Sequence, residues 1–239
     1  MSEVLEYWPA FLQGLWVTTW IALITILGGA VGAVLLGALR LSKTAAIRAA
    51  AMLFTELIRG PSAIVLLFWV FYALPLIPGM PRFGPQTAAI LVLTLDGAVY
   101  GAEIVRAGIE TVHRGQFDAC HALGLSKFNS FTRVVFPQAL SQIVPAFGSL
   151  ARDMVKWTAI VSFVGVQDIL YVANYVRGQT FKTAIVFALL AATYWILCLI
   201  CATAFRLLER ALPLNRALRA AQAPARVVPD LDALEGAAS

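Results

Sequence analysis

The sequence predicts an all-α protein that crosses a membrane about five times. The chain has 239 residues, of which 60% are hydrophobic and only 13% are charged, whereas soluble domains carry about 25% charged residues. The apolar residues gather in long runs, and a helix needs roughly 20 of them to cross a bilayer core of ~30 Å. With so few charged residues, the protein cannot present a polar surface to water on all sides. Part of its surface must therefore face lipid.

Polar stretches separate five predicted spans within a transmembrane domain of residues 1–210. Residues 1–14 predict a short interfacial segment, and the first span lacks the basic start and short apolar core of a signal peptide, so we interpret it as a retained helix. Residues 75–86 are rich in Pro and Gly and predict a loop. Residues 211–239 have no apolar stripe and predict a disordered cytoplasmic tail. The predicted spans cover roughly residues 15–39, 53–74, 87–105, 139–165 and 183–207.

The distribution of Lys and Arg predicts the orientation of the chain. Residues 40–59, 106–133 and 206–226 hold thirteen of these cations, and the opposite side of the predicted topology holds three. Cytoplasmic loops carry the excess of Lys and Arg. We therefore expect the N-terminus outside, and the C-terminus and the loop 106–138 in the cytoplasm.

The cytoplasmic loop predicts a short helix followed by a break. Gly124 can adopt positive φ and end the helix, and Pro137 can begin the next span. Such a helix can dock in a groove of another protein, or it can simply cap the bundle at the membrane surface. The residues that suit a helix with one polar and one small or apolar face are Asp118, Ala119, Ala122 and Leu123.

This loop resembles the EAA motif of ABC importer permeases, EAA-x3-G-x9-I-x-LP. The motif positions are filled, at the family spacing, by Asp118, Ala119, Cys120, Gly124, Val134, Phe136 and Pro137. The neighbouring words AEIVRAGIETV at 102–112 and TELIRG at 55–60 resemble the polar amino-acid branch of that family. Asp118 keeps the acid on a shorter stem, and Cys120 keeps a small side chain. The resemblance covers roughly residues 12–210.

The resemblance implies a type I ABC importer permease fold of five spans, with a cytoplasmic coupling helix between spans 3 and 4. It implies ATP-driven uptake of polar amino acids or related zwitterions through a bacterial inner membrane. The implied partners are a second permease chain, identical or not, a cytoplasmic ATPase dimer, an extracytoplasmic solute-binding protein and membrane lipid, with no nucleic acid. The residues implied to couple to the ATPase are Asp118, Ala119, Cys120, Ala122, Leu123 and Gly124.

The resemblance also implies that ATP and Mg²⁺ belong to the partner ATPase and that this chain is not an enzyme. The sequence contains no GxxxxGK[ST] phosphate-binding loop, which fits that division of labour. We expect no cofactor, no metal site and no catalytic residue in this chain. The pair Cys198 and Cys201 lies inside an apolar run without neighbouring ligands, and His113 and His121 have no ligand cluster around them.

Ionisable side chains at membrane depth are costly, and they mark cavities or partners. Arg152 and Lys156 are four residues apart and share a helix face. One hypothesis is a water-lined pocket in which Lys156 meets a solute carboxylate and an acid meets an ammonium group. The alternative is an internal ion-pair network without solute contact. The candidate residues of the substrate pathway are Asp96, Tyr100, Asp153, Lys156 and Thr158.

The sequence departs from the resembled family at this place. The family has a KDTSL-like stretch, and this chain has Trp157 where that stretch has Asp. The usual solute contacts are therefore in doubt, and an unusual amino acid, an opine-like derivative or a second, non-identical permease that carries the site are the alternatives.

Two other functional classes remain as rivals to an ABC permease. An ion-gradient-driven secondary transporter of small polar solutes would need no ATPase and would give the helix before Gly124 no docking role. An intramembrane enzyme would need a nucleophile with its base inside the spans, and Thr158 and Ser162 have no evident base in the sequence. ATP dependence separates the first rival, and turnover without transport separates the second.

Overall fold

A computed structural model describes residues 6–212, and within them every regular element is helical. The predicted all-α membrane fold is confirmed, since four helical segments are each long and apolar enough to span a membrane and a bent pair makes a fifth. The α-helices are α2 (Trp8–Arg40), α3 (Ala45–Arg59), α4 (Ala63–Phe68), α5 (Pro85–Glu110), α6 (Arg114–Ala122), α7 (Lys127–Ser130), α8 (Phe136–Trp157), α9 (Ile169–Thr180) and α10 (Thr183–Ala211).

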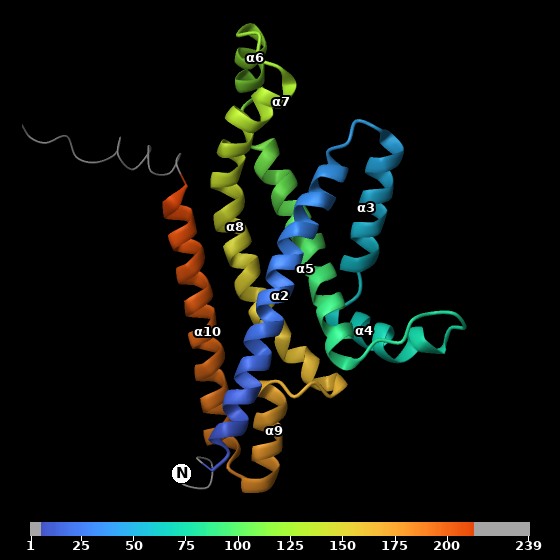
Figure 1. The fold of residues 1–239 in the computed structure, drawn as a ribbon, viewed down its shortest axis with the longest axis vertical. Coiled ribbons are helices and arrows are strands. Elements are labelled where there is room, and N and C mark those ends of the chain that lie inside the picture. The colour runs from blue at the N-terminus through green and yellow to red at the C-terminus, as the bar shows by residue number, and fades with distance from the viewer. Residues whose placement is uncertain (1–5, 213–239) are drawn as a thin grey trace, which may run out of the picture.

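Helices α2, α3, α5, α8 and α10 run roughly along the long axis of the molecule, whereas α4 lies across it (Figure 1). The turn between α2 and α3, the α6–α7 segment and the C-terminal end of α10 lie toward one end. The N-terminal end of α2, all of α9 and the start of α10 lie at the other end. The predicted cytoplasmic regions therefore gather at one end of the bundle. We call this the coupling end and the opposite one the outer end.

Helices α2 and α5 pack through small residues along their length. A Cβ added to Gly32 would lie 2.6 Å from the Cβ of Ala98, and one added to Gly101 would lie 2.6 Å from the Cβ of Ala33. Glycine at these positions lets the two backbones approach closely. Gly28 and Gly32, which form a GxxxG pair on α2, thus both face α5, and we call this contact the α2–α5 seam.

The second predicted span, residues 53–74, is not one helix. Helix α3 begins at Ala45 and ends at Arg59, and the chain then bends by 92° before the segment Ala63–Leu76. Pro61 lies in the break and has no backbone N–H to donate, whereas Gly60 before it still has helical dihedral angles, with φ −62° and ψ −49°. Arg59 is therefore separated from the turn between α2 and α3 by the whole length of α3. It does not lie with the other basic residues of 40–59, with which the sequence analysis grouped it.

The fourth predicted span differs from expectation in its start: Pro137 lies in the first turn of α8, as predicted, but the chain is already helical before it. Ser126 caps α7, its hydroxyl accepting a hydrogen bond from the Asn129 amide at 3.3 Å. The chain then stays helical through a π-helical turn, Phe131–Val135, into α8 and onward to Val164. The wide π turn accommodates the missing hydrogen bond of Pro137.

At the outer end, the polar segment before the last span forms α9 and rests on α2. The Thr18 hydroxyl accepts a hydrogen bond from the Ile169 amide at 3.1 Å, and a Cβ on Gly14 would lie 3.0 Å from the Asp168 carbonyl oxygen. Helix α2 is continuous from Trp8, so its first turns are not a separate interfacial segment. Most of the predicted disordered tail, residues 213–239, lies outside the described residues.

Candidate functional site

The predicted coupling helix is present as α6, and hydrogen bonds at both ends define it. The His113 side chain caps its start by accepting a hydrogen bond from the Gly115 amide at 3.1 Å. Gly124 has φ +71°, as predicted, and its N–H donates to the His121 carbonyl while the Leu125 N–H donates to that of Cys120, both at 3.0 Å. This paired arrangement is a Schellman motif. The capping role of His113 was not anticipated.

The side chains of α6 divide into one that faces inward and several that face outward. Cys120 is buried, so the third motif position packs against the protein itself. Leu123 is 77% exposed and Phe128 is 75% exposed, and Phe117 is also exposed. Large apolar side chains this exposed at the tip of the molecule form a surface suited to a partner. The other exposed residues of the predicted coupling set are Asp118, Ala119, Ala122 and Gly124.

The charged residues of α8 pair with each other. The Lys156 ammonium lies 2.8 Å from an Asp153 carboxylate oxygen, and Arg152 donates to the Ser149 hydroxyl at 2.9 Å. In this isolated chain the Lys156 and Asp153 side chains are 61% and 52% exposed. This ion pair lies within one helix and on a largely exposed face, so it decides neither for a solute pocket nor for an internal ion-pair network.

The remaining candidate residues of the pathway do not join this pair. Asp96 is buried in α5, and no hydrogen bond or ion pair links its side chain to another within residues 6–212. Thr158 is fully buried, and its hydroxyl donates to the Val155 carbonyl at 2.7 Å. The ring of Tyr100 lies 5.6 Å from the ring of Trp157. The five residues are thus spread over separate environments.

A charged network connects α2 and α5 nearer the coupling end. A Glu103 carboxylate oxygen lies 2.6 Å from an Arg40 guanidinium nitrogen, and the other oxygen accepts a hydrogen bond from Arg106. Arg106 also pairs with Glu110 at 2.6 Å. The link between Glu103 and Arg40 was not predicted, because it depends on how the two helices align.

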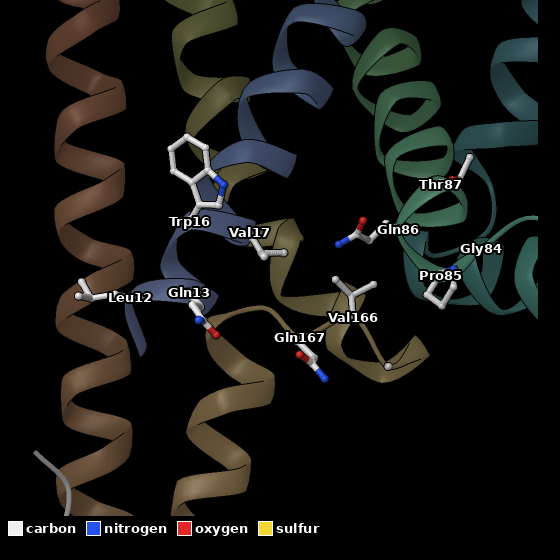
Figure 2. A pocket seen from close by; sticks show the side chains of 11 residues that line it. Leu12, Gln13, Trp16, Val17, Gly84, Pro85, Gln86, Thr87, Val166 and Gln167 are labelled. Carbon is white, nitrogen blue, oxygen red and sulfur yellow. The ribbon is translucent and has the colours of Figure 1, made fainter. Parts of the chain in front are cut away.

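At the outer end, an open cavity of about 820 Å³ lies between α2, the start of α5 and the loop before α9. Figure 2 shows three carboxamide side chains from these three elements around it, those of Gln13, Gln86 and Gln167. The apolar side chains of Val17 and Val166 also line it. Val166 belongs to, and Val17 packs against, an apolar cluster that joins residues of α2, α4, α5 and the turn after α8. The cavity carries no charged side chain. Nothing in the sequence analysis anticipated it.

Asp168 joins the loop to α9 and is fully buried. One carboxylate oxygen accepts a hydrogen bond from the Tyr171 amide at 2.9 Å and so caps α9. The other oxygen has no hydrogen-bond partner among the described residues. Burial raises the pKa of this carboxyl to about 6, although hydrogen bonds from backbone amides oppose the shift. The sequence noted Asp168 only as one polar residue among several.

A family model described as binding-protein-dependent transport system inner membrane component matches residues 29–213. A probable amino-acid ABC transporter permease protein of Sinorhizobium fredii is 33% identical over 208 residues, which are 85% of this chain and 87% of that protein. A nopaline transport system permease protein of Agrobacterium fabrum is 31% identical over 199 residues, 80% of this chain and 83% of that one.

Among solved structures, the crystal structure of an amino acid ABC transporter with histidines contains a similar chain. The TM-score is 0.80 with 29% sequence identity, and the match covers 87% of this chain and 97% of that one. The likeness includes nearly the whole of that chain, so the two share one architecture from the first span to the last.

Proposed function

This chain belongs to the family of binding-protein-dependent transport system inner membrane components, and on that premise we propose its solute, its partners and its orientation. It is a multi-pass inner-membrane protein and a permease subunit of an ABC transporter. The solute is a polar amino acid or a zwitterionic derivative such as an opine, since relatives are named for amino-acid and nopaline transport. A gradient-driven secondary transporter is not favoured by these relatives.

The observation that carries the proposal is the form of α6 together with the family match. A short helix closed by a Schellman motif ends in exposed apolar side chains at the coupling end, where Leu123 and Phe128 are three-quarters exposed. Contact with a cytoplasmic ATPase would bury them. ATP and Mg²⁺ bind in that ATPase, and its movement reaches the spans through α6, which continues by way of α7 into α8. On this proposal the coupling end and the C-terminus lie in the cytoplasm, as the distribution of Lys and Arg predicts.

A second permease chain, identical or not, covers the charged face of α8. Lys156 and Asp153 lie on a helix of membrane-spanning length and are more than half exposed in the single chain. A charged pair facing lipid costs several kcal/mol, roughly 2.5 or more for each group at the bilayer centre. A polar partner surface or a water-filled path between two chains removes most of that cost. Asp96, Tyr100 and Thr158 remain candidates for the walls of the path.

The outer cavity is the place where a solute leaves an extracytoplasmic binding protein and meets this chain. The three carboxamides can each donate and accept hydrogen bonds. They can therefore bind both the ammonium and the carboxylate group of a zwitterion without selecting for the net charge of the solute. The apolar cluster below the cavity closes the way inward in this conformation. Alternating access then requires this cluster to part when the ATPases close on ATP.

The test is uptake by the assembled complex in liposomes. The permease, its ATPase and its binding protein are reconstituted, and uptake of radiolabelled glutamine, histidine, arginine and nopaline is measured with ATP on the ATPase side. The proposal expects uptake of at least one of them that needs hydrolysable ATP and survives ionophores that collapse ion gradients. Uptake that continues without ATP and stops with the ionophores would establish the secondary-transporter alternative instead.

A further inference from the structure

Arg59 occupies an unusual place at the break of the second span. It is the last residue of α3, and the chain bends by 92° directly after it. Its aromatic neighbour is Tyr100 of α5. Tyr100 lies ten residues, about 15 Å of helix, before the end of α5. Arg59 thus brings a cation to the interior depth of the bundle, where ionisable groups mark functional sites by default.

Two aromatic rings from other helices support this cation. The guanidinium carbon of Arg59 lies 5.1 Å from the ring centroid of Tyr100, a distance typical of a cation–π contact. Tyr100 in turn packs against Trp157, whose ring centroid is 5.6 Å away. We call these three residues, from α3, α5 and α8, the arginine–aromatic cluster.

Arg59 has no direct ion-pair partner among the described residues, although its charge acts at longer range on Glu103 of α5. The Arg59 side chain forms no ion pair or hydrogen bond with another side chain within residues 6–212, and it is exposed. The nearest acid along α5, Glu103, is engaged by Arg40 and Arg106. Glu56, one turn earlier on α3, is exposed and forms no ion pair with it. The other cation considered for this role, Lys156, is already paired with Asp153 at 2.8 Å.

An arginine held by a ring face keeps its five N–H donors, which lie in the plane of the guanidinium. These donors match the two oxygens of a carboxylate. We propose that Arg59 binds the carboxylate of the translocated solute inside the membrane, and that Tyr100 and Trp157 form the aromatic wall beside it. This inference rests on the proposed function and names the chemical group that the pathway recognises: a free carboxylate.

The experiment measures binding directly, in the permease–ATPase complex in lipid nanodiscs, without nucleotide and without the binding protein, so that only the membrane site discriminates. The probe is whichever radiolabelled amino acid the liposome assay finds transported, and the competitors are the same compound unlabelled and its α-carboxamide. The natural complex should prefer the carboxylate. In Arg59→Gln, carboxylate binding should weaken about 10- to 100-fold while carboxamide binding changes little, because a charge-assisted bidentate contact is lost.

Two further variants separate recognition from folding. Arg59→Lys keeps the charge but loses the planar set of N–H donors. It should therefore still prefer the carboxylate, and its loss of affinity should be smaller than that of Arg59→Gln. Arg48→Gln removes a cation from the same helix, where it bonds the Ser42 carbonyl at 3.2 Å, and should leave the preference unchanged.

An unchanged preference in Arg59→Gln, equal losses in the Lys and Gln variants, or a natural complex without carboxylate preference would each overturn the inference. Failure of the proposed function looks different, because ATP-driven uptake would then be absent from the natural complex itself.

Discussion

The α2–α5 seam and the broken second span are neighbours in the bundle but differ in nearly every physical respect. Helix α5 buries twelve residues, four of them glycine or alanine in the stretch 96–102, and glycines of α2 meet it with no room for a Cβ. Helix α3 buries only Ala51 and Thr55, and large apolar residues of the broken span, such as Leu57 and Leu76, are exposed.

The difference shows which part of the molecule resists deformation. Close-packed small residues leave no space to slide, since interiors at this density transmit strain rather than absorb it. Helix α3, before the break at Gly60 and Pro61, has few buried contacts to lose when it moves. We therefore assign the role of a rigid frame to the seam and a mobile, solute-facing role to the broken span with Arg59.

Overfilling the seam should produce the largest effect. Gly101→Val adds a side chain whose Cβ would lie 2.6 Å from the Cβ of Ala33 and 2.9 Å from the Phe147 ring. We expect a loss of stability of about 3 kcal/mol or more, because overpacking displaces whole helices. The measurement is thermal unfolding of the detergent-purified protein. Gly178→Val is the matched control, since its Cβ would meet no atom within 4 Å; equal losses in both variants would contradict a rigid seam.

Straightening the broken span should impair transport more than stability. The double substitution of Gly60→Ala and Pro61→Ala restores a backbone N–H and favours a continuous helix, which would carry Arg59 away from Tyr100. Uptake in liposomes should fall about tenfold or more, since small displacements of positioned groups are costly, while the melting temperature stays close to that of the natural protein. Ser62→Ala, at a cap without a side-chain hydrogen bond, should transport normally. A double variant with normal uptake would remove the functional role of the bend.

The smallest effect concerns the junction of the frame with α9 and depends on pH. Because the pKa of Asp168 rises from 3.8 to about 6 in the folded state, its contribution to stability is present below pH 4 and is lost as pH rises through 6. Between pH 5 and 7 the loss is about 1 kcal/mol. Asp168→Asn keeps the cap acceptor and should unfold with a flatter pH dependence over this interval. A matched exposed change, Asp118→Asn, should leave the slope as it is; an unaltered slope in Asp168→Asn would refute the assignment.

Local chemistry made the coupling end predictable from sequence. The end of α6 follows from the conformational freedom of Gly124, and the long apolar runs locate most of the spans because hydrophobic length is a property of the chain alone. A Pro near the start of the second predicted span, Pro61, also indicates the break at Gly60 and Pro61. The long apolar run after it nevertheless favoured a single continuous span. The π-helical turn before Pro137 was not predicted, because its residues were assigned to the cytoplasmic loop.

The inner site was less predictable, because its contacts join distant helices. Lys156 and Asp153 are three residues apart, so their ion pair can be predicted from helical periodicity alone. The contact between Arg59 and Tyr100 depends on how far α3 descends before it breaks, and the outer cavity depends on three elements meeting. Neither is encoded by spacing within one segment.

The central claim, that this permease is driven by an ATPase docked on α6, is tested most directly by copurification in mild detergent. The natural chain is compared with Leu123→Glu, which places a charge on a side chain that is 77% exposed and so spares the fold. The control is Phe181→Asn at the outer end, where the native residue is 87% exposed with φ 54°, a conformation that Asn adopts readily. We predict that an ABC ATPase copurifies with the natural chain and the control and is lost with Leu123→Glu. An ATPase retained equally by all three chains, or absent from the intact natural complex, would contradict the claim.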